Sequence, residues 1–350
     1  MDRDLLYAVQ KRIPFQQARK MLVQNGFPTG LGWDDIYQKL NDKSAQASAD
    51  VAGLYDAYLE TLIASQKAMH TYKIKDADAN AIRNQISSLS IPSNVFSKRF
   101  PYILSNAEIK NTAAGPPKLA GQIDLVDGTA LIFCSIRELE LRDEIKTNLI
   151  PKTLRDNYTK VIGVKIERHQ TFDVVLIPKT GGTVKMLTDA PSGVNGQAIS
   201  GSLFSIRTAM NSFAGAKLFH KPINLYPTIR PFYNSNEGIV QRLGYSTTTS
   251  SIKSEKMRGA GKCLRTELFH KSGMAALNKS DFQTFEIQLA WELPSKDRFK
   301  TRPELGVFGS YRMTYATNPI VSVATVSKCL TYDEFNFVAG KLMLAVSGKI

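Results

Sequence analysis

The residues best suited to chemistry lie in one basic segment, residues 242–271, which carries seven lysines or arginines against two acidic residues. A serine and threonine run, 246–251, and the glycines Gly259 and Gly261 lie among them. Cationic side chains, hydroxyl groups and backbone amides are the groups that bind phosphate oxygens in nucleic acids. We therefore expect this segment to bind the phosphate backbone of a nucleic acid. The expected contacts are Arg242, Lys253, Lys256, Arg258, Lys262, Arg265, His270 and Lys271.

The stretch before this segment adds basic and aromatic residues. Its basic residues are Arg207, Lys217, Lys221 and Arg230. Phe232 and Tyr233 can stack on the bases of a single strand, although one of two adjacent aromatic residues usually packs in the core. A second interpretation of 242–271 stays open, because serine, threonine, glycine and lysine are also typical of a mobile, solvated loop.

Three acidic residues suggest an alternative, a magnesium-dependent nuclease. Two carboxylates on adjacent strands can hold a metal ion while a lysine steadies the attacked phosphate. Asp124 ends an expected strand, and Glu138 and Glu140 follow the next one. Glu140 stands where the lysine of an E-x-K pattern belongs, and Lys165 or Lys146 would have to replace it. The leading interpretation is therefore non-catalytic, with no cofactor.

Histidines and cysteines predict no metal site. No two of the four histidines have the spacing of metal ligands, and no two of the three cysteines form a C-x-x-C pair. Free thiols are expected, which is typical of a reducing compartment. The remaining residues of these types are His70, His169, His220, Cys134, Cys263 and Cys329.

The net charge is the strongest bulk property. The chain has 45 basic and 31 acidic residues, a net charge of +14 and a pI near 9.5. Residues 1–110 hold 14 basic and 11 acidic residues, which is +3, and the remainder therefore carries +11. Concentrated positive charge attracts polyanions, of which nucleic acid is the commonest in cells. A scattered surface charge without such a partner is the opposing interpretation.

Long apolar segments are absent from the sequence. The longest apolar runs, such as 174–177, are strand-sized and far shorter than the roughly 18 residues of a membrane span. The N-terminus lacks an apolar signal core. We expect no membrane association and a cytoplasmic location, with the nucleus as an alternative.

Residues 1–110 have the periodicity of helices. Leu5, Leu6, Val9 and Ile13 share one face, and a second helix is expected from Pro14 to a stop at Gly26. The strongest apolar stripe predicts a helix over 49–72, with His70 capping its end, and another helix is expected over 77–89.

After a Gly-Pro-rich boundary at 111–117, the pattern changes to strands. Strands are expected over 122–126, 129–135, 160–168, 171–177, 183–187, 284–292, 307–315 and 320–326. Asp127-Gly128 predicts a tight hairpin turn, residues 196–213 predict a helix, and Thr331 with Glu334 predicts a capped helix start.

Together these patterns predict an α+β protein: a small helical domain over 1–110, followed by a larger, mainly antiparallel sheet domain over 118–350. The leading function is non-catalytic binding of nucleic acid, duplex DNA first, through residues 242–271. The alternatives are the magnesium-dependent nuclease and a subunit of a larger complex that docks a protein partner through residues 1–110.

Overall fold

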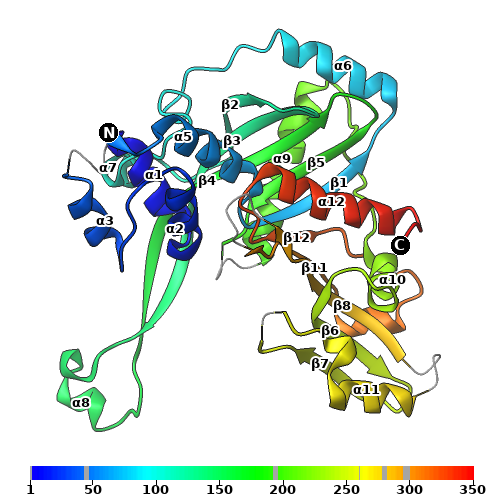
Figure 1. The fold of residues 1–350 in the computed structure, drawn as a ribbon. Helices are drawn as coiled ribbons and strands as arrows, with labels where there is room; N and C mark the ends of the chain where they lie inside the picture. The colour runs from blue at the N-terminus through cyan, green and yellow to red at the C-terminus, as the bar shows by residue number, and fades with distance from the viewer. Residues whose placement is uncertain (1, 43–46, 192–195, 260, 278–281, 295–299) are drawn as a thin grey trace.

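One antiparallel sheet organises the molecule. A computed structural model describes residues 2–42, 47–191, 196–259, 261–277, 282–294 and 300–350. Ten strands form the sheet in the order β2-β3-β4-β5-β1-β12-β11-β8-β6-β7 (Figure 1). The strands are β1 (Lys67–Lys73), β2 (Lys118–Asp124), β3 (Gly128–Glu144), β4 (Ile162–Pro178), β5 (Thr183–Asp189), β6 (Ile239–Thr247), β7 (Ile252–Lys256), β8 (Phe282–Ala290), β11 (Glu304–Phe308) and β12 (Ala324–Ser327). The expected α+β class is confirmed.

Helices cover the sheet, and β9 (Leu293–Pro294) pairs with β10 (Lys300–Thr301) in a separate two-stranded sheet. The helices are α1 (Arg3–Arg12), α2 (Phe15–Gln24), α3 (Trp33–Lys39), α5 (Val51–Ala64), α6 (Asp76–Ser87), α7 (Asn106–Asn111), α8 (Lys152–Arg155), α9 (Gly196–Phe213), α10 (Ile229–Asn234), α11 (Leu268–Ala275) and α12 (Tyr332–Val346). None of the described helices is long and apolar enough to cross a membrane.

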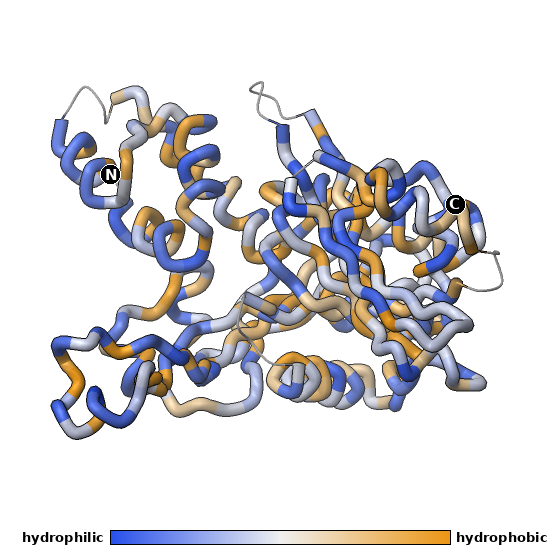
Figure 2. Tube along the Cα trace, turned by 90° about the horizontal axis from the view of Figure 1, so that it is seen from below, coloured by the Kyte–Doolittle hydropathy of each residue, from blue (hydrophilic) through white to orange (hydrophobic). Residues whose placement is uncertain are grey.

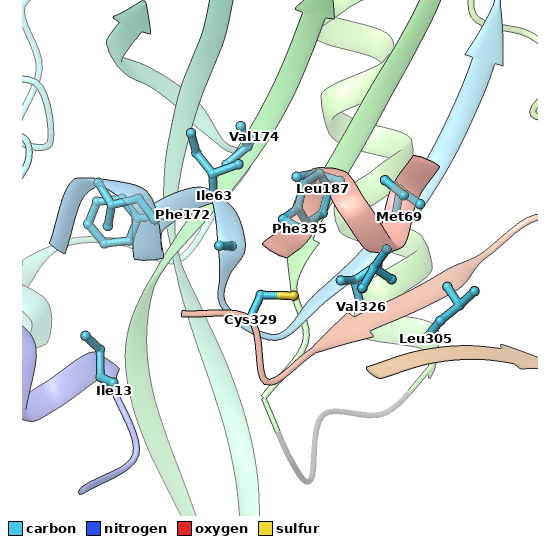
Figure 3. Close-up of a cluster of buried hydrophobic side chains, with 14 of the residues drawn as sticks. Ile13, Ile63, Met69, Phe172, Val174, Leu187, Leu305, Val326, Cys329 and Phe335 are labelled. Atoms are coloured by element: carbon cyan, nitrogen blue, oxygen red, sulfur yellow. The ribbon is translucent and has the colours of Figure 1, made fainter. Parts of the chain in front are cut away.

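The two faces of the sheet bury separate hydrophobic clusters. The larger cluster joins α1, α2, α5, α10 and α12 to one face, and Phe335 of α12 lies among sheet residues such as Leu187 and Val326 (Figure 3). The smaller cluster joins α6 and α9 to the opposite face of β1, β3, β4 and β5. Hydrophobic positions accordingly run along the strands and along one side of the helices (Figure 2).

The N-terminal region is helical, but it also supplies a central strand. The expected helix over 49–72 is wrong in its second half, because α5 ends at Ala64 and residues 67–73 form β1. Strand β1 pairs with both β5 and β12, and these long-range backbone hydrogen bonds override the helical periodicity. His70 lies in this strand and caps no helix. The boundary at 111–117 consequently does not separate two hydrophobic cores.

Strands β3 and β4 are much longer than expected. The segments 160–168 and 171–177 form one 17-residue strand, β4, which pairs with 17 residues of β3. The outer parts of these strands, with α8 at their far end, leave the body of the sheet as a two-stranded projection (Figure 1). We call residues 138–168 the arm. The sequence pattern predicted a strand over 160–168 but none over 138–144, and it gave no sign that these strands leave the core.

Several local predictions are confirmed and one is corrected. The Asp127-Gly128 turn joins β2 to β3, and Thr331 accepts a hydrogen bond from the Glu334 amide at the start of α12. The strand expected over 307–315 ends at Phe308, and residues 311–315 form a 3-10 helix instead. Gly309 lies close to the Phe285 carbonyl, where the chain leaves the sheet.

Candidate nucleic-acid interface

The basic segment 242–271 is ordered structure at one end of the sheet. Strands β6 and β7 form a hairpin in which β7 is the last strand of the sheet, and α11 follows it. The serine and threonine run lies at the hairpin turn, where Ser250 has a positive φ of 64°. Ser246 and Thr247 are buried, so their hydroxyl groups do not face solvent. The interpretation of this segment as a mobile loop does not fit its strand pairing.

Arg265, one of the expected phosphate contacts, holds the backbone together instead. Its guanidinium donates hydrogen bonds to the carbonyls of Phe232, Tyr233, Glu237 and Gly238 at 2.6–3.0 Å. These bonds use the donors that a phosphate would need, and they fix the connection between α10 and β6. Arg265 is therefore a structural residue, and its expected role in binding is not supported by its geometry.

His270 is also built into the interior, with only 2% of its surface exposed. Its Nδ1 contacts Glu255, and its Nε2 lies 2.9 Å from the Tyr233 hydroxyl. Glu255 also accepts a hydrogen bond from the Tyr245 hydroxyl at 2.7 Å, and burial together with this carboxylate raises the pKa of Tyr245. Both ring nitrogens are engaged, so His270 is a satisfied core histidine and does not face a ligand.

The remaining cations of the segment are exposed. Neither an ion pair nor a side-chain hydrogen bond involves them within the described part of the chain, whereas Arg242 pairs with Glu286 at 2.9 Å. Arg242 lies opposite Lys256 in the β6–β7 register, so both side chains project from the same face of the sheet. The exposed, unpaired cations are Lys253, Lys256, Arg258, Lys262 and Lys271.

Cations from distant parts of the sequence extend this surface. The Lys262 carbonyl accepts a hydrogen bond from Gln241, and a Cβ at Gly261 would lie 3.0 Å from the Arg302 guanidinium. Arg302 and Lys300 share Glu292 at 2.6 and 3.1 Å, and Lys20 of α2 donates to the Lys300 carbonyl. Contacts and strand register thus link six of these cations, and Arg258 lies two residues beyond Lys256 in the chain. We call the seven the basic track: Lys20, Arg242, Lys256, Arg258, Lys262, Lys300 and Arg302.

The track contains cations that the sequence did not single out. Lys20, Lys300 and Arg302 lie far from 242–271 in the chain, and their only sequence signal is the overall excess of positive charge. Within the residues that the structure describes, two carboxylates, Glu286 and Glu292, pair with cations of the track. The balance remains strongly positive.

The basic residues before position 242 lie elsewhere. Arg207 of α9 stacks on Phe204 and faces His70 of β1, where burial and this cation lower the His70 pKa to about 4. Strand β1 is four strand steps from β6, which is about 19 Å at about 4.8 Å per step. Lys217 and Lys221 are exposed in the segment after α9. These three residues do not join the basic track.

The two aromatic residues beside Arg230 are not available for base stacking. Phe232 has no exposed surface, and Tyr233 packs against Phe282 and His270. Arg230 donates to the Phe282 carbonyl at 3.1 Å.

The acidic residues of the nuclease alternative are far apart. Asp124 pairs with Thr129 in the β2–β3 register, and Glu138 lies nine residues further along β3, about 30 Å away at about 3.3 Å per residue. Glu138 and Glu140 lie on the arm and pair with Arg168 and Arg142. A single metal ion cannot contact both Asp124 and Glu138.

Asp124 does line a cavity of about 350 Å³ between the β2–β3 hairpin and α6. The other charged residues of its wall are Arg83 and Lys179, so the cavity offers one carboxylate and two cations. Among the described residues no cluster of three or more histidine, cysteine or acidic side chains is arranged to hold a metal ion. Cys134, Cys263 and Cys329 are all free thiols.

A buried ion cluster, which the sequence did not indicate, attaches α1 to the sheet. Lys67, fully buried, donates to Asp189 and to the Phe172 carbonyl, both at 2.6 Å, and Arg12 of α1 pairs with the same carboxylate at 3.1 Å. Burial opposes ionisation of Asp189, but Arg12 and Lys67 outweigh it and hold the Asp189 pKa below its ordinary range. Because α2 follows α1 directly, this cluster also helps to position Lys20 beside Lys300.

Comparison with known proteins identified no relative of this chain. No protein-family model matches the chain, and no curated protein matches it.

Proposed function

We propose that this protein binds nucleic acid through the phosphate backbone, without catalysis, along the basic track. The observation that carries the proposal is the gathering of seven cations from four separate parts of the chain, with two carboxylates paired to them among the described residues. Four of these cations, Lys20, Lys256, Arg258 and Lys262, have no carboxylate partner within the described residues. Adjacent, unpaired cations repel each other, and a polyanion relieves that repulsion.

Duplex DNA is the first expected ligand, without strong sequence preference. The track is made of lysine and arginine, side chains that contact phosphate oxygens. Phosphate contacts position a protein on a duplex but carry no sequence information directly. Binding should therefore be similar for duplexes of different sequence and should weaken steeply with salt.

A titration of the intact protein into fluorescent duplex DNA, single-stranded DNA and RNA tests the proposal. We expect saturable binding at low salt, with the logarithm of the affinity falling linearly with the logarithm of the salt concentration. Undetectable binding to all three at low salt would refute it.

The docking role of residues 1–110 gains no specific support. The apolar faces of α1, α2 and α5 pack into the shared core, within the part of the chain that the structure describes. The nuclease alternative is not proposed, because its carboxylates lie on separate parts of the sheet.

A further inference from the structure

Exposed aromatic side chains gather at one place in the chain. Six phenylalanine or tyrosine side chains are exposed among the described residues, and Phe308, Tyr311 and Tyr315 are three of them. These three lie within eight consecutive residues, whereas no other described stretch of that length holds more than one. Grouped, exposed rings indicate a contact surface. We call Phe308, Tyr311 and Tyr315 the aromatic ledge.

Phe308 projects from the face of the sheet that α10 and α12 do not cover. Phe308 of β11 lies opposite Glu286 of β8, and Glu286 lies opposite Gly244 of β6. Residues paired in this way project from the same face of a sheet. The adjacent residues Leu243 and Ile287 belong to the larger hydrophobic cluster, which lies on the other face together with α10 and α12.

Two glycines make room for aromatic rings on this face. A Cβ at Gly306 would clash with the ring of Phe308, and a Cβ at Gly244 would clash with the ring of Phe285. Both rings therefore lie over the backbone of the sheet. Phe285 is buried in this position, whereas 38% of the Phe308 surface remains exposed.

Cations lie directly beside these rings. The Arg242 guanidinium, which belongs to the basic track, lies 5.6 Å from the centre of the Phe308 ring, and Lys256 lies opposite Arg242 in the β6–β7 register. The Arg312 guanidinium lies 6.0 Å from the centre of the Tyr311 ring, and Arg312 forms no ion pair within the described residues. A surface of neighbouring rings and cations suits a nucleotide, because its phosphate is anionic and its base has a π face.

The two tyrosines of the ledge lie in the 3-10 helix over residues 311–315, which adjoins the same face. The Ser246 hydroxyl of β6 donates a hydrogen bond to the Thr314 hydroxyl at 3.2 Å. Ser246 lies four residues from Arg242 along β6, which is about 13 Å at about 3.3 Å per residue, and the two side chains project from one face. The 3-10 helix therefore holds the tyrosines next to the strand that carries Arg242.

Exposed rings next to cations fit unpaired bases better than an intact duplex. A protein reaches the bases of a duplex only at their edges, through the grooves. The bases of a single strand have free faces, and these stack on aromatic side chains whatever the sequence. The cations of the track bind the phosphate backbone of either form.

We propose that the aromatic ledge stacks on unpaired bases while the basic track holds the adjoining phosphate backbone. The preferred ligand is therefore a nucleic acid in which a single strand extends from a duplex. This inference rests on the proposed binding of nucleic acid along the basic track, and it adds which structure of the nucleic acid is bound.

Fluorescence anisotropy with three labelled DNA ligands tests the inference. The ligands are a blunt duplex, the same duplex with a single-stranded extension of about ten nucleotides, and that extension alone. The variant Y311A/Y315A removes two rings of the ledge, and Y311F/Y315F keeps both rings but removes their hydroxyl groups. The matched control Y158A/F204A removes two exposed rings that lie outside the ledge. Circular dichroism and thermal unfolding establish that each variant is folded.

We expect the wild type to bind the extended duplex at least about 25-fold more tightly than the blunt duplex, because each stacked base contributes about five-fold or more. Y311A/Y315A should weaken binding of the extended duplex by about 25-fold and leave binding of the blunt duplex unchanged. Its salt dependence on the extended duplex should equal that of the wild type, because stacking neutralises no phosphate. Y311F/Y315F and Y158A/F204A should bind as the wild type does.

The possible failures separate this inference from the proposed function. If the wild type binds DNA but Y311A/Y315A binds the extended duplex equally well, the ledge does not contact bases and the inference is wrong, while the proposed function stands. The inference is also wrong if Y158A/F204A loses as much affinity as Y311A/Y315A, or if Y311F/Y315F loses as much. A wild type that binds none of the three ligands at low salt refutes the proposed function and this inference with it.

Discussion

Removing three cations from the basic track gives the sharpest test of the proposed function. The variant K256A/R258A/K262A removes exposed side chains that form neither ion pairs nor side-chain hydrogen bonds within the described residues. The fold should therefore be unaffected, and any change in binding reports the lost charge. Arg265 and His270 are left in place because their contacts hold the backbone and the core.

The expected size of the effect follows from counterion release. Each phosphate neutralised on a duplex contributes about 0.9 to the slope of log affinity against log salt. The four cations without a carboxylate partner give a slope of about −3.6, and all seven give about −6.3. The triple variant should make this slope shallower by about 2.7. Because affinity extrapolated to about 1 M salt should not change, binding at about 0.1 M should weaken by about 500-fold.

Fluorescence anisotropy with a labelled duplex, repeated from about 50 to about 200 mM salt, measures this slope. The matched control K98A/K118A/K349A removes the same charge from three exposed lysines away from the track. The control should change the slope by less than about one unit. If both triple variants make the salt slope shallower by the same amount, binding reflects the diffuse net charge. If neither variant changes the slope, the track does not contact DNA.

Three further predictions concern residues that the structure places in the interior. Asp189→Asn should destabilise the fold by about 3–5 kcal/mol in urea unfolding at neutral pH, because Lys67 stays buried without its counter-charge, and a loss below about 1 kcal/mol would contradict this. The folded-state pKa of His70, about 4, lies below its ordinary 6.5, so folding stability should fall as pH drops from 6.5 to 4, by about 3 kcal/mol in total. His70→Gln should remove this pH dependence, and an unchanged pH profile of urea unfolding would count against the interpretation. Arg265→Lys should lower the free energy of unfolding by about 2 kcal/mol or more, because lysine cannot donate to all four carbonyls. The same variant should leave the salt dependence of DNA binding unchanged, and a shallower slope would show that Arg265 does contact DNA.

Local chemistry accounts for the elements that sequence reasoning recovered. The stripe of Leu54, Tyr58 and Leu62 predicted α5, and these residues are buried as that stripe requires. Asp127-Gly128 predicted a tight turn because glycine and aspartate tolerate the backbone angles of such turns, and Thr331 predicted the start of α12. In each case the signal lies within a few neighbouring residues, so no distant contact was needed.

Long-range pairing accounts for the elements that were missed. Residues 67–73 continue the apolar pattern of α5 but become β1, because hydrogen bonds to β5 and β12 outweigh helical propensity. The arm was not recognised from the sequence. Alternation of apolar and polar residues in β3 and β4 indicates a strand, but it does not indicate whether both faces of that strand remain in solvent. The burial of Lys67 was equally invisible, since its counter-charge Asp189 lies 122 residues away, and Arg12, which shares that carboxylate, lies 55 residues away.

The sequence by itself determined the α+β class, the excess of positive charge after residue 110 and the basic character of 242–271. The tertiary structure alone decided which of those cations remain free: it directed Arg265 and His270 inward, brought Arg302 beside Gly261 and brought Lys20 beside Lys300. Composition sets how much charge a chain carries, but a charge binds a ligand only where the fold leaves it exposed and close to others of the same sign.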